Sequence, residues 1–192
     1  MTLAVVIVTA YLLGSVPMSY IVVYRMTGRD IRTLGDGNPG TMNVWHSVGL
    51  RAALIVAAGD VGKGMAAVGI AHIAGLGDGS AIIAGLMAVA GHDFSIFLRL
   101  HGGNGTAAAI GALFALVPQA AIPAAAVAVG LYLAVGSKRF AGLIGLLLVP
   151  LLTYRLEYPD VLLVGVLLLL TVTALKIVAF EGFTPARSRL DR

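Results

Sequence analysis

Two glycine-rich segments of this 192-residue chain contain the residue types that bind anions. The first, GDGNPGTMN at 35–43, places the amides of Asn38 and Asn43 among glycines that include Gly40. Glycine lets backbone N–H groups point into one concavity, which is an arrangement that binds phosphate. The same composition also fits an ordinary polar loop with turn residues, so this segment alone leaves both interpretations open.

The second segment, HGGNGTAAAIG at 101–111, comes directly before a run of small residues that we expect to start a helix. The free N–H groups and the dipole at a helix start favour phosphate binding. The segment is not a Walker A motif, which ends in Lys-Ser/Thr at a fixed spacing. A simple loop at a helix start is the alternative. The candidate phosphate-binding residues are Gly102, Gly103, Asn104, Gly105 and Thr106.

Ionisable residues within apolar segments are a third candidate for chemistry. Asp60 and Lys63 are three residues apart, so a helix places both on one face. Charges in such segments are expensive and usually face a cavity or a partner, and a purely structural ion pair is the alternative. His92, beside Asp93, lies near the end of another apolar segment. It is a candidate base or phosphate ligand, or else a hydrogen-bonded packing residue.

Other catalytic chemistries lack their residues. The chain has no cysteine, which removes disulfides and thiolates as nucleophiles or metal ligands. Its four histidines lack a zinc-ligand spacing, and no G-x-S-x-G motif frames a serine nucleophile. We therefore expect no metal site and no covalent serine or cysteine intermediate.

The composition indicates that lipid surrounds the elements that carry these residues. Hydrophobic residues make up 59% of the chain, charged residues only 11%, and the mean hydropathy is +0.97. A soluble domain carries roughly a quarter charged residues. We therefore expect an all-α integral membrane protein that forms a single domain over residues 1–192. The net charge of +4 is spread over many short segments, so we expect no nucleic-acid partner.

The apolar segments predict seven transmembrane helices, since about 20 mostly apolar residues cross a bilayer. The first is too long for a signal peptide, and we expect it to be a retained span. The fourth and fifth are short and are separated only by Pro118 and Gln119, so a six-span protein with one bent helix is the alternative. The predicted spans are 3–24, 52–74, 80–98, 105–119, 120–136, 140–156 and 160–180.

The distribution of lysine and arginine favours seven spans. Positive residues concentrate on the cytoplasmic side of membrane proteins. Seven spans leave only Arg155 on the opposite side, which places the N-terminus outside and the C-terminus in the cytoplasm. Both glycine-rich segments and the turn that carries Arg139 then share the cytoplasmic face. The residues on that face are Arg25, Arg29, Arg32, Arg51, Arg99, Lys138, Arg139, Arg187, Arg189 and Arg192.

The order and spacing of these motifs resemble the bacterial acyl-phosphate-dependent glycerol-3-phosphate acyltransferases, a family of small seven-span membrane enzymes. The resemblance covers most of the chain and is strongest from Gly14 to Gly111. The motifs that carry it are GSVP at 14–17, GDGNPGTMNV at 35–44, DVGKG at 60–64, GHDFSIF at 91–97 and HGGNGTAAAIG at 101–111.

The resemblance implies transfer of an acyl group from acyl phosphate to the 1-hydroxyl of glycerol-3-phosphate, giving lysophosphatidic acid and phosphate. It implies acyl phosphate, glycerol-3-phosphate and membrane lipids as partners, without coenzyme A, acyl carrier protein or any cofactor. Acyl phosphate is already activated, so the departing phosphate can take the proton while the protein supplies positioning and electrostatic stabilisation. We expect a monomer in the bacterial inner membrane, with its active site facing the cytoplasm. Its catalytic candidates are His92, Asp60 and Lys63.

Several polar positions differ from the family pattern, most notably Asn104, where the family has lysine. A lost charge-assisted hydrogen bond costs about 1.5–3 kcal/mol. The alternative is therefore a catalytically inactive relative that binds or transports a phospholipid or small anion, or regulates an active one. Arg99, His101, Arg139 and Lys176 are the candidates to restore positive charge. The other departures are Asp36, Thr41, Met42, His46, Gly142, Gly145, Ile177 and Phe180.

Overall fold

The structure is a computed structural model that describes residues 2–183, and the side chains of Lys138, Arg139 and residues 180–183 lie outside the described part. Every regular element in residues 2–183 is helical, which confirms the predicted all-α class. The elements are α1 (Leu3–Ser15), α2 (Met18–Thr27), η1 (Ile31–Thr33), α3 (Thr41–Ser47), α4 (Leu50–Ile73), α5 (Asp78–Asp93), η2 (Ile96–Leu98), α6 (Thr106–Leu116), α7 (Pro118–Val135), α8 (Lys138–Arg155) and α9 (Asp160–Phe183).

Each predicted span coincides with an apolar helical segment. Five such segments are long and apolar enough to cross a membrane, and α6 and α8 are shorter apolar helices. α6 and α7 are separate helices, because α6 ends before Val117 and Pro118 begins α7. The predicted boundary at Pro118 is thus the boundary between two helices.

The first predicted span is not one continuous helix, which corrects the expectation for residues 3–24. α1 ends at Ser15 and α2 begins at Met18, with Val16 and Pro17 between them in non-helical conformations. Proline has no N–H and its ring clashes with the preceding turn, so a helix breaks there. The break leaves the Val16 carbonyl without a helical partner, and this carbonyl becomes part of the site described below.

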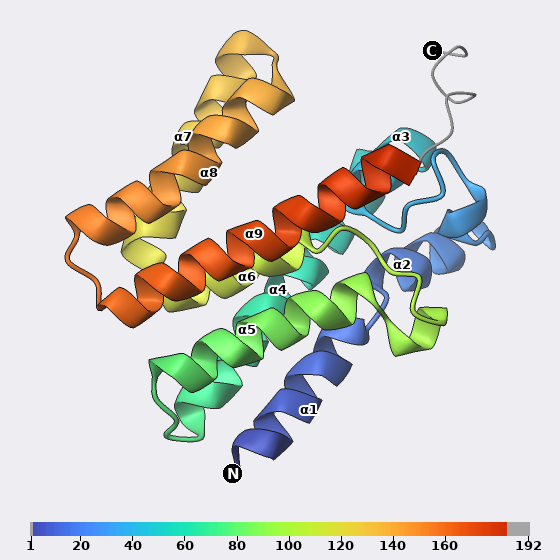
Figure 1. Ribbon diagram of the computed structural model, residues 1–192. Helices are drawn as coiled ribbons and strands as arrows, with labels where there is room; N and C mark the ends of the chain where they lie inside the picture. Colours follow the sequence, from blue (N-terminus) through green and yellow to red (C-terminus); the bar gives the residue numbers. More distant parts are fainter. Residues whose placement is uncertain (1, 184–192) are drawn as a thin grey trace.

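Glycines let the central helices approach closely. A Cβ at Gly14 would collide with the backbone of Ala88, so α1 and α5 touch through backbone atoms. Gly64 has the same relation to Ala108, which brings α4 against α6. Small residues at such contacts allow the close packing that stabilises helices in lipid. The result is a core of α1, α4, α5 and α6 with α9 packed along it (Figure 1).

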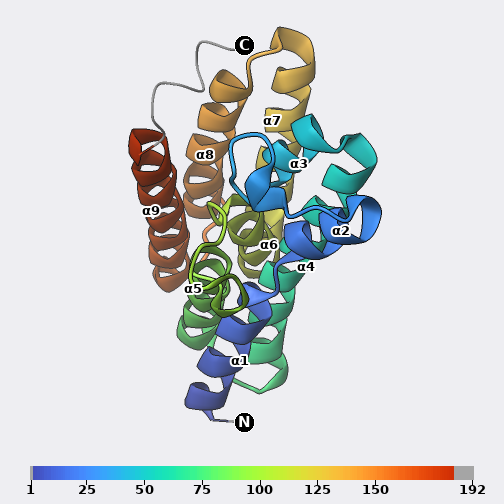
Figure 2. The ribbon, with the colours of Figure 1, turned by 90° about the vertical axis from the view of Figure 1, so that its right-hand side faces the viewer.

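The two glycine-rich loops lie on the same side of the molecule. The loop between α2 and α3 and the loop between η2 and α6 both face the viewer in Figure 2. By contrast, α7 and α8 pair with each other, and the end at which they are joined stands apart from these loops (Figure 1). Arg139 is at that end, at the start of α8.

Candidate active site

Two adjoining cavities bring the glycine-rich loops together with the buried charges. A small cavity of about 10 Å³, enough for one water molecule, reaches Asp60, Lys63 and His92. A larger cavity of about 600 Å³ lies beside it. Pro39 and Gly102 line both. The residues that line the larger cavity are Asp30, Arg32, Thr33, Gly37, Pro39, Leu100, His101, Gly102 and Lys176.

A buried charge cluster forms the floor of the small cavity. The Nζ atom of Lys63 lies 2.8 Å from Oδ1 of Asp60, and Nδ1 of His92 lies 3.4 Å from the same oxygen. Lys63 also donates a hydrogen bond of 3.1 Å to the carbonyl of Val16 at the break in the first span. All three side chains are buried. The predicted pairing of Asp60 and Lys63 is present, and it includes His92.

The second glycine-rich loop folds over His92. The N–H of Gly103 donates to the carbonyl of His92, and the N–H of Gly102 donates to that of Asp93. A Cβ at Gly103 would lie 3.3 and 3.4 Å from two ring carbons of His92 and closer still to Nε2. These two N–H groups, which we predicted as phosphate donors, are thus engaged within the protein.

The first turn of α6 has backbone N–H groups without a partner inside the helix. Gly105 begins the helix with a φ of +69°, a left-handed conformation that suits glycine, and its carbonyl accepts from Ala109. The first N–H groups of any helix have no carbonyl in a preceding turn, so those of Thr106, Ala107 and Ala108 have no partner within α6. Asn104 is half-buried, and its Oδ1 atom is buried without a hydrogen-bond partner. The start of α6 therefore offers N–H donors beside one unpaired amide oxygen.

In the first glycine-rich loop, Asn43 holds the backbone together. Its Nδ2 atom donates to the carbonyls of Leu34 and Asn38, both at 2.9 Å, and its Oδ1 accepts from Ser47. Its amide is therefore used inside the loop, whereas we predicted that it binds substrate. Asn38 keeps a buried Oδ1 without a hydrogen-bond partner, and Gly40 lies beside its amide group.

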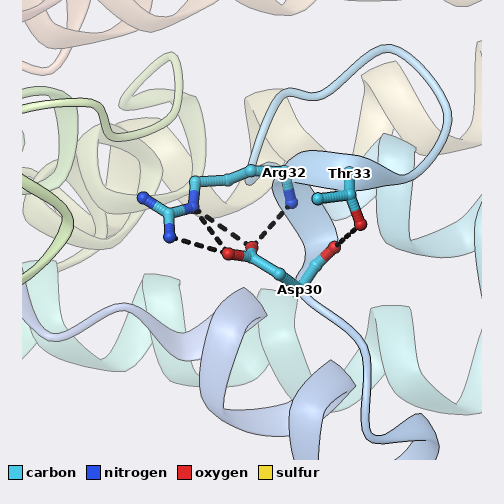
Figure 3. Close-up of polar contacts among 3 residues, drawn as sticks. All are labelled: Asp30, Arg32 and Thr33. Atoms are coloured by element: carbon cyan, nitrogen blue, oxygen red, sulfur yellow. Dashed lines mark hydrogen bonds and ion pairs between the residues drawn. The ribbon is translucent and has the colours of Figure 1, made fainter.

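Asp30 and Arg32 both line the larger cavity. Their side chains form an ion pair (Figure 3). Nη2 of Arg32 donates to Oδ2 of Asp30 at 2.7 Å, and its backbone N–H donates to Oδ1 at 2.9 Å. These bonds hold the pKa of Asp30 below its usual range. The Thr33 hydroxyl adds a bond to the Asp30 carbonyl. The guanidinium is thus tied to a carboxylate at the cavity edge.

We expect low pH to break the ion pair between Asp30 and Arg32. The pKa of Asp30 is lowered in the folded protein, so the pair stabilises the loop above the usual aspartate pKa of about 4, and this stabilisation is lost as the pH falls through the lowered value. The pair is partly exposed, so its contribution is about 1 kcal/mol or less. The single tryptophan, Trp45 in α3, follows the loop and can report on it by fluorescence.

Two variants test the role of the ion pair between Asp30 and Arg32. Asp30→Asn should change Trp45 emission already at pH 7 and remove the wild-type change below about pH 4. Asp36→Asn is the matched control, because an amide oxygen can replace the Asp36 oxygen that accepts from the Asn38 N–H. Identical emission from Asp30→Asn and the wild type at pH 7 would contradict the assignment.

The other predicted residues divide by location. Thr106 is exposed at the start of α6. The side chain of Arg139 lies outside the described part, and its helix packs against α7 and α9 rather than the glycine-rich loops. Phe180 and Arg187 also fall outside the described side chains. Ile177 is half-buried in α9, one residue after Lys176.

Sequence reasoning missed two parts of the site. Arg32 was counted only as a topology charge, although its position two residues after Asp30 allows a local pair. Ser95 lines the small cavity and donates its hydroxyl to the carbonyl of Ser15, which ties η2 to the broken first span. The sequence gives no signal for this second contact, because its partners are 80 residues apart.

The fold and the buried polar site define a multi-pass integral membrane protein with a cleft between two glycine-rich loops. Residues 4–181 match the family model described as glycerol-3-phosphate acyltransferase. The chain belongs to this family. Its predicted family resemblance is thereby confirmed.

Individual relatives agree with the family match. Glycerol-3-phosphate acyltransferase 2 of Dehalococcoides mccartyi (strain ATCC BAA-2266 / KCTC 15142 / 195) is 41% identical over 60% of this chain, but the match spans only 55% of that relative. The enzyme named glycerol-3-phosphate acyltransferase in Azotobacter vinelandii (strain DJ / ATCC BAA-1303) is 38% identical over 84% of this chain and 85% of its own.

A solved structure shares the fold. The crystal structure of PlsY (YgiH), an integral membrane glycerol 3-phosphate acyltransferase, in its glycerol 3-phosphate form superposes with a TM-score of 0.82 and is 25% identical. The superposition covers 100% of this chain and 92% of that one. The lysophosphatidic acid form superposes with a TM-score of 0.81.

Proposed function

We propose that this protein transfers an acyl group from acyl phosphate to the 1-hydroxyl of glycerol-3-phosphate. A new ester bond forms between the hydroxyl oxygen and the acyl carbon, the bond from that carbon to the phosphate oxygen breaks, and inorganic phosphate leaves with the hydroxyl proton. The observation that carries this proposal is the buried cluster of Asp60, Lys63 and His92 beneath a cleft formed by both glycine-rich loops.

We assign the catalytic roles within that cluster. Asp60 faces Nδ1 of His92 and orients its ring, and Lys63 balances the aspartate charge. The opposite nitrogen, Nε2, lies against Gly103, and we place it nearest the reacting groups. There it accepts the hydroxyl proton or binds the phosphate, with the departing phosphate as the alternative proton acceptor. No step needs a cofactor or metal.

We place both substrates in the larger cavity and its mouth. Asn38 and Gly40 shape the side that belongs to the first loop, and Asn43 holds that loop in place. Asn104, Gly105 and Thr106 offer the start of α6 to the donor phosphate, while Gly102 and Gly103 position His92. We retain Arg139 only as a candidate that reaches substrate from the start of α8.

The membrane arrangement is part of the proposal. Seven apolar helical segments support seven spans in one domain, with the N-terminus outside and the C-terminus in the cytoplasm. The shared side of the two glycine-rich loops supports an active site on the cytoplasmic face of the bacterial inner membrane. We propose a monomer, because both loops and the charge cluster come from one chain.

Asn104 is the observation that favours a second candidate function. Its uncharged side chain leaves a buried oxygen unpaired at the start of α6, where a phosphate site needs donors. A protein that binds a phospholipid or small anion without acyl transfer would not need a positive charge at position 104.

One assay separates the two functions. The purified protein in detergent receives palmitoyl phosphate and glycerol-3-phosphate, and release of phosphate and formation of lysophosphatidic acid are measured. We expect equal amounts of both products. Folded protein that forms no lysophosphatidic acid would contradict acyl transfer and favour binding alone.

Asn104→Lys should lower the KM for palmitoyl phosphate. An ammonium group at the start of α6 adds a charge-assisted hydrogen bond, which corresponds to a decrease of about tenfold. Asn104→Met is the matched control, since it supplies similar length without charge and should not lower the KM. An unchanged or higher KM in the lysine variant would show that this loop does not face the donor.

A further inference from the structure

The larger cavity receives a positive charge from the far end of the chain. Lys176 lies in α9 and lines this cavity with Arg32 from the first loop and His101 from the second. These cationic or potentially cationic side chains come from three segments far apart in sequence. A cleft lined by positive side chains attracts anions, because the surrounding protein focuses their field.

Lys176 differs from Arg32 and His101 in that no hydrogen bond or ion pair within the described part of the chain holds its charged group. The Arg32 guanidinium is paired with the Asp30 carboxylate, which offsets much of its charge. The His101 ring has Nδ1 at 2.7 Å from the Arg99 carbonyl, so Nδ1 carries the proton and a neutral ring leaves Nε2 as an acceptor. Among the described residues, no carboxylate lies within ion-pair distance of Lys176, although the buried Asp93 carboxylate interacts with its charge from farther away. The Lys176 ammonium therefore keeps hydrogen-bond donors for an anion.

An aromatic ring holds Lys176 at the cavity. Its Nζ atom lies 4.3 Å from the centre of the Phe94 ring, a cation–π contact. Phe94 directly follows the last residue of α5, and its carbonyl accepts a 2.7 Å hydrogen bond from the Tyr11 hydroxyl of α1. The ring contacts one side of the ammonium group, so the N–H groups that point away from the ring can still donate to an anion.

We propose that Lys176 binds the substrate phosphate group in the larger cavity and that Phe94 is its positioning residue. The ligand class is a phosphate monoester or an acyl phosphate, both of which present phosphate oxygens to an ammonium group. This inference rests on the proposed acyl transfer for its kinetic test. It adds a phosphate ligand from α9 to cavities whose other lining residues all precede α6.

Four variants test the proposal, each against glycerol-3-phosphate, palmitoyl phosphate and inorganic phosphate as inhibitor. Lys176→Gln should raise the inhibition constant of phosphate and the KM of one substrate about tenfold, the loss expected for one charge-assisted hydrogen bond. The substrate whose KM rises is the one whose phosphate Lys176 binds. Lys176→Arg should stay within about threefold of wild type, because it keeps the charge and the ring contact.

The Phe94 variants separate positioning from folding. Phe94→Leu should raise the same KM about two- to fivefold with little change in kcat, because a cation–π contact contributes about 0.5–1 kcal/mol. Phe94→Tyr keeps an aromatic face and should restore the wild-type KM. In Lys176→Gln, the additional Phe94→Leu change should have no further effect on the KM. Arg155→Gln, an exposed charge at the end of α8, is the matched control for loss of charge.

The outcomes separate this inference from the proposed function. Wild-type turnover with Lys176→Gln unchanged in KM and phosphate inhibition would overturn the role of Lys176 and leave acyl transfer intact. If the wild type does not turn over, the stabilisation of the folded protein by inorganic phosphate is measured instead. A phosphate-dependent rise in Tm that Lys176→Gln abolishes supports the site without the reaction. An equal rise in both proteins overturns it.

Discussion

Replacing Gly103 with alanine is expected to lower kcat by about 100-fold or more, because a small displacement of a reacting group has effects of this size. The new methyl group would occupy the space of the His92 imidazole, whose other side faces Asp60. The ring is buried and borders only a cavity the size of one water molecule, so we expect it to shift away from its contact with Asp60. The physical reason thus differs from a clash with bound phosphate, which the loop sequence alone suggests.

The measurement is lysophosphatidic acid formation, with Tm recorded on the same sample. Gly62→Ala is the matched control, because Gly62 lies exposed on α4 and a Cβ there meets no atom within 4 Å. Alanine in a helix favours folding by about 0.5–1 kcal/mol relative to glycine, so the control should be active and at least as stable. Full activity in Gly103→Ala would refute the placement of His92 at the reacting groups.

Asp60→Asn is expected to have the second large effect, on both activity and stability. It leaves the buried Lys63 ammonium without a paired negative charge, with only the Val16 carbonyl and an uncharged amide oxygen to accept its hydrogen bonds. Breaking a buried ion pair in this way costs about 3–5 kcal/mol. His92 loses its orienting carboxylate at the same time, and loss of acid–base function lowers kcat by a factor of about 10²–10⁴.

A double variant distinguishes a catalytic pair from a structural one. Asp60→Asn combined with Lys63→Met removes both charges, and such replacement of a buried pair is often neutral for stability. We expect the Tm to recover relative to Asp60→Asn while activity stays absent. Recovery of both would mean that the pair only supports the fold.

The other end of α4 offers a control for the aspartate itself. Asp78 and His72 form a 3.9 Å contact in which both side chains are 42% exposed. Asp78→Asn should change the free energy of unfolding by no more than about 0.5 kcal/mol, as is usual at exposed sites. A large effect there would indicate a general response to charge loss rather than a role for the buried cluster.

The family match includes the residues that we assign to the site. The match covers residues 4–181, so it includes the charge cluster, both glycine-rich loops and Lys176. The shared fold of the PlsY structures extends over the whole chain in one of the two forms. The variants at Asn104 and Lys176 test separately whether each of these two positions contributes to phosphate binding.

The sequence by itself determined the features that depend on neighbouring residues. Long apolar segments predict helices in lipid, and the helix period places Asp60 and Lys63 on one face, as the 2.8 Å ion pair confirms. The glycines at 102–105 likewise predict the start of a helix. α6 does begin directly after Gly105, which adopts a left-handed conformation there. These features follow from residues that are close together in the sequence: about 20 for an apolar span and four for a pair on one helix face.

Only the tertiary structure decided which helix faces meet. It placed the Val16 carbonyl on Lys63, 47 residues away, His92 against Asp60, and Lys176 over Phe94. In water an apolar stripe would mark the inward face of each helix, but these helices are apolar on all sides, and lipid does not distinguish one side from another. Helix rotation is then fixed by close contacts at glycines such as Gly14 and Gly64, whose partners the sequence pattern does not identify.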